Sequence, residues 1–413
     1  MDSLFYSEPS AVTSKGTNFP QLSGCNMRID LPESQRISAP PDLATPLSQP
    51  SSVDTAGGQF QIARLQLTDG PSQDVELLLV DTGRVRAAIC PTRGMSLWKA
   101  NIDGDNLGWK SPVEGPVHPN WVPISEPSGI GWLDGFDELL VRCGLRSFGA
   151  PDFGPSGSLT FPLHGRIANL PARNVQIEVD QAHSLLHVTG EVHEARFLQT
   201  NLRLGVRYTF ALDEPKIAIH DTVTNAAAVP VDMQLLYHIN IGAPHLQQGS
   251  TLHLNADKIV ARNAHAAKDL ADWSTYLGPT AGYAEQVYFS ASRADASGWT
   301  KCLLASREGK RGVAVHYRPE TLPFFSQWKN TVAEADGYVT GLEPATGFPN
   351  PRSFEESHGR LVQLQAGESR EFVLTIEGIA SAERIAAVKH EITRAGAAPS
   401  TSAYDADWCV AES

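Results

Sequence analysis

The sequence predicts an all-β protein, built as a large antiparallel β-sandwich with few short helices. Three observations predict it: many medium-length runs of alternating or apolar residues, turn signals between these runs, and little helical periodicity. The clearest alternation is Asn201–Leu212, where Leu202, Leu204 and Val206 share one face with the later apolar residues of the run. A period of two is that of a strand with one buried face.

Further strands are predicted along the whole central part of the chain. In chain order they lie at 59–67, 74–81, 84–90, 174–179, 184–192, 216–224, 231–241, 311–317, 360–364 and 371–376. Turn signals such as Asp213-Glu-Pro and Gln365-Ala-Gly separate neighbouring runs. Because little helix intervenes, we expect antiparallel sheets that fold onto each other.

One long helix is predicted, from about Ser381 to Arg394. Ser381 can act as its N-cap, and Ile385, Val388 and Ile392 recur at helical spacing. Shorter helices are expected within two connections, at 132–140 and 264–273.

Composition divides the chain into three expected parts. Residues 1–58 are rich in Ser, Pro, Thr and Gly, which favours an extension or strap rather than a domain. Residues 59–380 are expected to form the sandwich domain, and 381–413 a C-terminal helix and tail. Length alone does not force a division of the central part, since large sandwiches often form single units.

Charge and cysteine content limit the possible partners. A formal net charge of −13 without a long Lys/Arg run disfavours binding to nucleic acid or to an anionic membrane. The five cysteines are odd in number, widely spaced and form no C-x-x-C, so we expect reduced thiols. Neither a signal peptide nor an apolar run long enough to cross a bilayer is visible, so a cytoplasmic location is expected. Whether the protein is a monomer or a homodimer stays open.

Candidate chemistry lies in three segments on three predicted β-stretches: 163–166, 237–240 and 341–344. They contain His164, His238 and Glu343. At neutral pH glutamate is ionised and histidine can donate or accept a proton, so such a set suits acid–base chemistry. The same three residues could instead be buried and hydrogen-bonded for structural reasons.

The chain resembles the galactose mutarotase-like superfamily, in particular its uncharacterised aldose 1-epimerase-related branch. The resemblance rests on an ordered set of motifs between about residues 60 and 380: Arg93-Gly-Met, Cys143-Gly-Leu, Leu163-His-Gly-Arg, Leu236-Tyr-His-Ile-Asn, Gln327-Trp-Lys and Glu343-Pro. It implies a sandwich that binds a small sugar and interconverts its α and β anomers without metal or organic cofactor. In that scheme Glu343 is the base, His238 the acid, and His164 a second catalytic histidine facing the sugar.

Five further residues are predicted to bind substrate: Arg93, Arg166, Asn240, Trp328 and Lys329. The arginines have forked donors suited to hydroxyl groups or an anionic substituent, and a tryptophan face can stack on sugar C–H groups. The competing interpretation is surface ion pairs for the arginines, and a core tryptophan beside a solvated lysine. The acidic residues Asp134, Asp137 and Glu138 are interpreted as a charged helix face rather than a hydroxyl-binding lip.

The sequence leaves the sugar open. No counterpart of the substrate-orienting aspartate of galactose mutarotase is visible, and the loops 108–131 and 263–286 are expected to shape specificity. Two other functions stay possible at this point. Two histidines and a glutamate can also hold a divalent ion, as in a metal-dependent sugar isomerase or lyase. A carbohydrate-binding module without catalysis is the other alternative.

Overall fold

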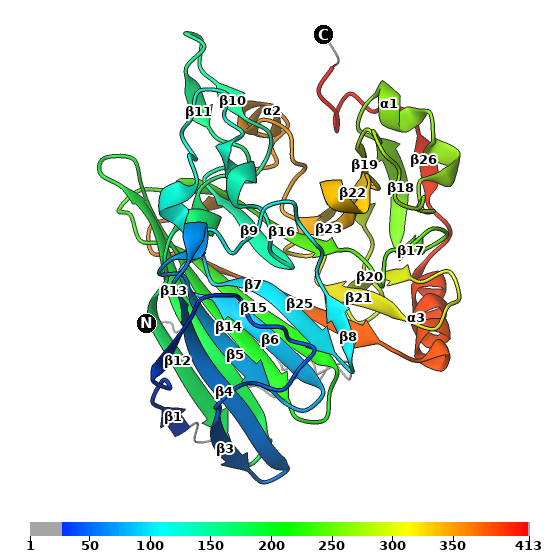
Figure 1. Ribbon diagram of the computed structural model, residues 1–413. Helices are drawn as coiled ribbons and strands as arrows, with labels where there is room; N and C mark the ends of the chain where they lie inside the picture. The colour runs from blue at the N-terminus through cyan, green and yellow to red at the C-terminus, as the bar shows by residue number, and fades with distance from the viewer. Residues whose placement is uncertain (1–26, 412–413) are drawn as a thin grey trace, which may run out of the picture.

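The computed structural model describes residues 27–411, and two large β-sheets dominate it (Figure 1). Residues 1–26 of the predicted extension, which include Cys25, and residues 412–413 lie outside the described residues. One sheet has nine strands, in the order β1 (Met27–Ile29), β12 (Arg173–Asp180), β13 (Leu185–Arg196), β14 (Thr200–Ala211), β15 (Lys216–Asn225), β25 (Ser369–Ile379), β21 (Gly312–Tyr317), β20 (Thr300–Ala305) and β17 (Thr251–Leu254).

The other sheet has fifteen strands. Its main path is β2 (Ser34–Ile37), β4 (Gly58–Leu67), β5 (Glu76–Asp81), β6 (Val85–Cys90), β7 (Ser96–Ile102), β9 (Leu140–Leu145), β16 (Val231–Ile241), β23 (Val339–Ala345), β22 (Phe324–Asn330), β19 (Gln286–Ser292), β18 (Ala256–Ala261) and β26 (Ser400–Ser402). Beside this path, β3 (Ser51–Thr55), β8 (Asp105–Leu107) and β24 (Val362–Leu364) each pair with one strand. A separate two-stranded sheet is formed by β10 (Asp152–Phe153) and β11 (Leu159–Phe161), near the top of Figure 1.

The predicted all-β sandwich is confirmed. Within residues 27–411, the β2–β4 and β18–β26 pairs are parallel and the other strand pairs are antiparallel. The alternating run at 201–212 forms β14, and its apolar residues Leu202, Leu204 and Val206 are buried. Period-two burial of this kind drives two sheets to pack face to face.

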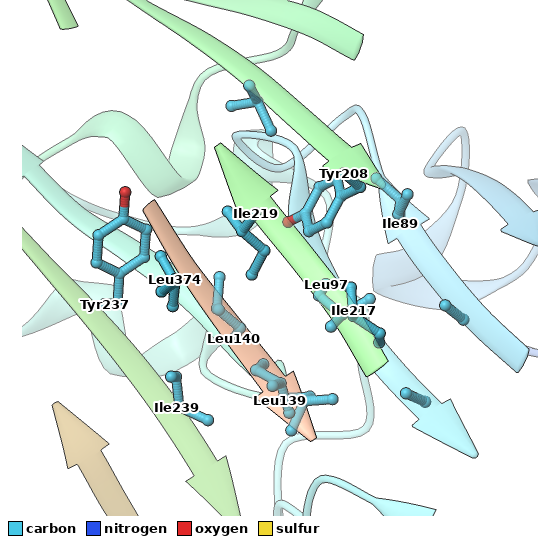
Figure 2. Close-up of a cluster of buried hydrophobic side chains, with 14 of the residues drawn as sticks. Ile89, Leu97, Leu139, Leu140, Tyr208, Ile217, Ile219, Tyr237, Ile239 and Leu374 are labelled. Atoms are coloured by element: carbon cyan, nitrogen blue, oxygen red, sulfur yellow. The ribbon is translucent and has the colours of Figure 1, made fainter. Parts of the chain in front are cut away.

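The main core lies between the sheets. Figure 2 shows side chains from both sides: Leu97 and Ile239 come from the larger sheet, and Ile217, Ile219 and Leu374 from the smaller one. The core also holds a polar group, because Arg142 of β9 reaches across to Asp221 of β15 at 2.5 Å. The hydroxyls of Tyr208 and Tyr237 complete this buried network.

Helices are few, as predicted. The long one is α3 (Ala382–Ala395), and the Ser381 hydroxyl caps it by accepting from the Arg384 N–H. The connection at 264–273 forms α1 (Ala264–Ala267) and a short 3-10 turn. The connection at 132–140 differs from the prediction: it holds only a 3-10 turn at Gly131–Gly135, and β9 begins at Leu140. The remaining helix, α2, covers Arg352–Ser357.

The part of the extension that the structure describes joins both sheets. Strand β1 pairs with β12 at the edge of the smaller sheet, whereas β2 and β3 pair with β4 of the larger sheet. Between β2 and β3, Leu43 is buried against the outer face of the larger sheet. These residues therefore connect the two layers at one edge of the molecule.

The register of the larger sheet places the predicted site on its outer face. Asn240 lies opposite Gly341, and Ser326 lies opposite Glu343. Residues directly opposite each other in antiparallel strands share a face, so His238, Asn240 and Glu343 point to the same side. Their chain neighbours, such as Tyr237 and Ile239, point into the main core.

Candidate functional site

A glutamate and a histidine from adjacent strands form the centre of the site. His238 on β16 and Glu343 on β23 place Nε2 and Oε1 3.3 Å apart. Both side chains are nearly withdrawn from solvent, with 4% of His238 and 3% of Glu343 exposed. A buried carboxyl group beside an imidazole, without a cation in contact with it, is a candidate for proton transfer.

His164 comes from a different part of the chain and lies beside this pair. Its ring centroid is 5.3 Å from that of His238, and the two rings are nearly perpendicular. Its Nδ1 lies 2.8 Å from the backbone carbonyl of Phe148, which can only accept, so Nδ1 carries a proton. In the neutral ring Nε2 is then the free acceptor.

The position of His164 differs from the prediction, which placed it on a strand. It lies in a turn that follows β11, with a left-handed φ of 57°. The next residue, Gly165, also has positive φ, and a Cβ there would lie 2.0 Å from the Ser147 carbonyl oxygen and 2.3 Å from that of Gly144. Only glycine allows this close backbone approach, which holds the turn against the end of β9.

Aromatic rings surround the two histidines. Trp132 packs on His164 with ring centroids 4.5 Å apart, and Phe136 packs on His238 at 5.1 Å. Trp328, on β22, lies 5.5 Å from His238 and is half-buried. The rings exclude water from the acid–base groups, and the partly exposed face of Trp328 could contact a ligand.

Burial shifts the pKa values of the three candidate catalytic groups. It raises the pKa of Glu343 to about 8, helped by the nearby Glu285 carboxylate and opposed by Arg262. Burial also lowers the pKa of His238 well below its usual value, and the neighbouring His164 adds to this effect. The pKa of His164 falls to about 4, again because of burial. In the free protein the shared proton therefore resides on Glu343.

Asn240, predicted to bind substrate, instead contacts protein groups. Its Oδ1 lies 2.6 Å from His238 Nδ1, and its Nδ2 donates to the backbone carbonyls of Glu138 and His238. Both ends of the amide are hydrogen-bonded to protein groups, so Asn240 holds the His238 ring through its Nδ1 side.

Arg93 is also engaged by protein groups and is fully buried. Its Nε donates to Glu138 at 2.6 Å, and its two terminal nitrogens donate to the carbonyls of Val117 and Gly135 and to the side chain of Asn169. The prediction of a sugar-binding arginine and the competing idea of a surface ion pair both differ from this arrangement. The sequence did not predict these contacts because the partners of Arg93 come from three loops that are distant from it in the chain.

Of the three acidic residues expected on a charged helix face, only Asp134 is exposed, in the 3-10 turn Gly131–Gly135. Asp137 and Glu138 are buried, and Asp137 accepts hydrogen bonds from Trp98 and Lys99. They anchor the segment that carries Phe136 rather than facing solvent.

Lys329 and Arg166 lie apart from the Glu–His pair. Lys329 follows Trp328 on β22 and so points to the opposite face, where its Nζ donates to the carbonyls of Asp272 and Thr275. Arg166 is half-buried near Glu194 of the smaller sheet. Burial raises the pKa of Glu194, and the positive charge of Arg166 partly opposes that rise.

Besides the aromatic residues Trp132 and Phe136 described above, the sequence prediction missed three residues of the site. Glu285 accepts a hydrogen bond of 2.7 Å from the Trp328 indole N–H, and Arg262 lies 3.9 Å from the other oxygen of the same carboxylate. Glu285 belongs to the loop 263–286, which was expected to shape specificity, but no motif marks it. Gly341 is the third: a Cβ at this position would lie 2.4 Å from Glu343 Oε1.

Across residues 27–411, no group of three His, Cys, Asp or Glu side chains is arranged to hold a metal ion. In the same range, none of the helices is long and apolar enough to span a bilayer.

The fold is that of a galactose mutarotase-like β-sandwich. A galactose mutarotase-like protein from Clostridium acetobutylicum superposes with a TM-score of 0.53 at 13% identity, covering 78% of this chain and 98% of that one. A galactose mutarotase related enzyme from Lactobacillus acidophilus gives a TM-score of 0.52 at 11% identity, covering 74% and 98%. At such identities the likeness concerns the fold alone.

A nearer relative and a family model place the chain more narrowly. A Klebsiella pneumoniae protein, provisionally assigned as an aldose 1-epimerase, is 31% identical over 84% of this chain and 91% of its own, with a TM-score of 0.81. The model of the domain of unknown function DUF4432 matches residues 72–377. The chain belongs to the DUF4432 family. None of the curated proteins compared with the chain matches it.

Proposed function

We propose that this protein is a carbohydrate isomerase that interconverts the α and β anomers of an aldose or aldose derivative. The observation that carries the proposal is the buried Glu343–His238 pair, 3.3 Å apart and adjacent to His164. The fold class and the provisional assignment of the Klebsiella protein agree with it.

Anomer exchange needs one proton removed from the C1 hydroxyl and one delivered to the ring oxygen. Both oxygens are bonded to the same carbon, so two neighbouring groups on the protein can reach them together. Glu343 takes the hydroxyl proton and His238 donates to the ring oxygen; the opened aldehyde rotates, and the transfers reverse on its other face.

The pair needs only one proton for this cycle. The ionised Glu343 with protonated His238 contains the same number of protons as the neutral pair that burial favours, and the two forms differ by one transfer between Oε1 and Nε2. Ring opening returns the pair to its neutral form. Protonation of both groups, or loss of the shared proton, removes the competent state.

The surrounding residues have supporting roles in this proposal. His164 offers its free Nε2 as an acceptor for a sugar hydroxyl. Trp328 supplies a face for sugar C–H groups, and Glu285, held by the Trp328 N–H, accepts a hydroxyl hydrogen bond at the partly exposed side of the site. Glu285 and Arg262 are therefore the proposed determinants of which sugar is accepted.

The decisive experiment is an NMR exchange screen over aldoses, uronic acids and sugar phosphates, measuring α/β interconversion with and without the purified protein. Acceleration for one class, unchanged by EDTA, is the expected result. Activity lost with chelator and restored by a divalent ion would replace the proposal with a metal-dependent isomerase. Binding of a sugar without any acceleration would favour a carbohydrate-binding module.

A further inference from the structure

The donors and acceptors around Asn240 restrict which nitrogen of His238 can carry its proton. The Asn240 amide nitrogen faces two backbone carbonyls, those of Glu138 at 3.0 Å and of His238 at 3.3 Å. Carbonyl oxygens only accept, so the NH₂ end of the amide must point toward them. The amide oxygen is thereby directed at His238 Nδ1, 2.6 Å away.

An amide oxygen cannot donate, so His238 Nδ1 must bear a hydrogen in both the neutral and the protonated ring. The nitrogen that gains and loses a proton is then Nε2, which faces Glu343 Oε1. With the opposite tautomer, Asn240 Oδ1 and a bare Nδ1 would be two acceptors in contact, buried and unable to recruit water.

The orientation of the amide is itself fixed by a second buried contact. Glu138, whose carbonyl receives the Asn240 amide, has its carboxylate bound by Arg93 Nε at 2.6 Å, and its other oxygen accepts from the Asp137 backbone N–H. The Glu138 carbonyl also accepts from the Trp109 indole. Two residues predicted from the sequence to bind sugar, Arg93 and Asn240, thus belong to one rigid support.

We infer that Asn240 is a positioning residue that fixes the tautomer of His238, so that Nε2 alone exchanges a proton with Glu343 and substrate, and that Arg93 acts through Glu138 to hold Asn240 in this orientation. The inference deepens the proposed function. Only its catalytic part, the proton exchange of Nε2 with substrate, rests on that proposed function. The tautomer itself is a property of the protein without substrate.

The test is ¹⁵N NMR of the histidine rings in the full-length, substrate-free protein, with the His238 signals assigned by their loss in His238→Gln. The expected wild-type spectrum shows a protonated Nδ1 and a bare Nε2 for His238. A neutral ring with the proton on Nε2 would overturn the inference. Apart from His238→Gln, which assigns the signals, this measurement needs no variant, so it decides the matter even if Asn240→Leu fails to fold.

Asn240→Leu removes the acceptor at similar side-chain volume. The preference for the Nδ1-protonated form should be lost and the exchange rate should fall by about 10²-fold, within the range expected when acid–base catalysis fails. A retained tautomer in this variant would contradict the positioning role. If wild-type His238 has the inferred tautomer but no sugar is exchanged, the proposed function fails and the tautomer assignment stands.

A matched control is available on the other sheet. The buried His187 of β13 also contacts an oxygen through Nδ1, that of Thr209 at 2.9 Å. Thr209→Val should move the His187 ring signals while the His238 tautomer and the exchange rate stay as in wild type. A change of the His238 signals in this control would show that general disturbance of the sandwich, not the Asn240 contact, sets the tautomer.

Discussion

Two buried glutamate–histidine pairs occur between residues 27 and 411, and burial and contacts shift their glutamate pKa values in opposite directions. In the site, Glu343 and His238 are 3.3 Å apart, and burial raises the Glu343 pKa to about 8. On the other sheet, Glu377 of β25 and His316 of β21 are 2.8 Å apart, and the Glu377 pKa is lowered to about 2. Both glutamates are 3% exposed, so solvent exposure alone does not explain the difference.

The closer hydrogen bond from His316, at 2.8 Å, and a neighbouring arginine together explain it. Arg384 of α3 forks onto Glu377, with Nε donating to one carboxylate oxygen at 2.7 Å and Nη2 to the other at 2.9 Å. These bonds and the His316 contact outweigh the desolvation that opposes ionisation. For Glu343, the negative charge of Glu285 adds to the effect of burial, and the positive charge of Arg262 opposes it. We therefore interpret the Glu377 pair, with its short hydrogen bond and adjacent cation, as a structural ion pair, and propose that the Glu343 pair transfers protons.

The largest expected effect is a difference in exchange rate between variants of the two glutamates. Glu343→Gln should reduce the acceleration of anomer exchange by about 10²–10⁴-fold, because the amide cannot accept the hydroxyl proton. Glu377→Gln should leave exchange within a few-fold of wild type while it lowers thermal stability. The measurement is NMR exchange with the sugar found in the screen, alongside binding of that sugar. Equal losses in both variants would mean that the sandwich, not the pair, governs the rate.

A second effect tests the space around Glu343. Gly341→Ala places a Cβ 2.4 Å from Glu343 Oε1 and 3.2 Å from His238 Cε1. Because a glutamate side chain can swing aside, the fold should tolerate the change, but a displacement of about 1 Å can cost up to about 10²-fold in rate. We expect an exchange rate lowered by about 10- to 100-fold with little change in melting temperature.

Gly205→Ala is the matched control for this prediction. It is also a glycine within a strand, and a Cβ there meets no atom nearer than 3.8 Å. Its exchange rate should equal that of wild type. An unchanged rate in Gly341→Ala would show that the position of the Glu343 carboxylate is not critical.

These pairs also show what the sequence can and cannot predict. Alternation identified β14 and β16, because burial of one sheet face imposes a period of two. The same alternation argues against the prediction that Trp328 and Lys329 both bind substrate. The two residues are consecutive in a strand, so their side chains point to opposite faces. The structure places Trp328 beside His238 and Lys329 on the other face.

What the sequence could not supply is the identity of distant partners. Arg93 lies in a motif that suggests ligand binding. Its contacts are instead with Glu138, Val117 and Gly135, which lie in loops distant from it in the sequence. Glu285 has no local pattern and becomes part of the site only through Trp328. The difference between Glu343 and Glu377 depends on the distance to the histidine of each pair and on an arginine that a helix brings beside Glu377.

The third expected effect is a pair of opposite pH dependences in stability. The Glu343 pKa rises from 4.5 to about 8 in the fold, so its contribution is complete below pH 4.5 and is lost as the pH rises through 8. The Glu377 pKa falls from 4.5 to about 2, so its contribution is present above pH 4.5 and is lost as the pH falls through 2.

Denaturant unfolding across pH 2–9 measures both effects. The difference in unfolding free energy between wild type and Glu343→Gln should change between pH 4.5 and 8, and that for Glu377→Gln between pH 4.5 and 2. Subtracting each variant from wild type removes the contribution of other titrating groups. Coincident pH windows for the two variants would show that the carboxyl groups have similar environments, against the contrast seen in their contacts.

The smallest expected effect tests the arginine directly. Arg384→Met removes the forked cation but keeps an unbranched side chain on α3, whose apolar residues Ile385, Val388 and Ile392 stay packed against the sheet. Removing one partner of a fully buried ion pair costs several kcal/mol. Because 36% of the Arg384 side chain is exposed, we expect a loss of only about 1–2 kcal/mol in unfolding free energy near pH 7.

The pH dependence of that loss makes the prediction specific. Arg384 stabilises the ionised form of Glu377, so the difference from wild type should be largest near neutrality and shrink toward pH 2, as Glu377 is protonated. Arg394→Met, the same substitution at an exposed position of the same helix, should change the unfolding free energy by less than about 0.5 kcal/mol at any pH. A loss in Arg384→Met that is independent of pH would indicate lost packing rather than lost charge. The cation would then not be what separates the structural pair from the pair in the site.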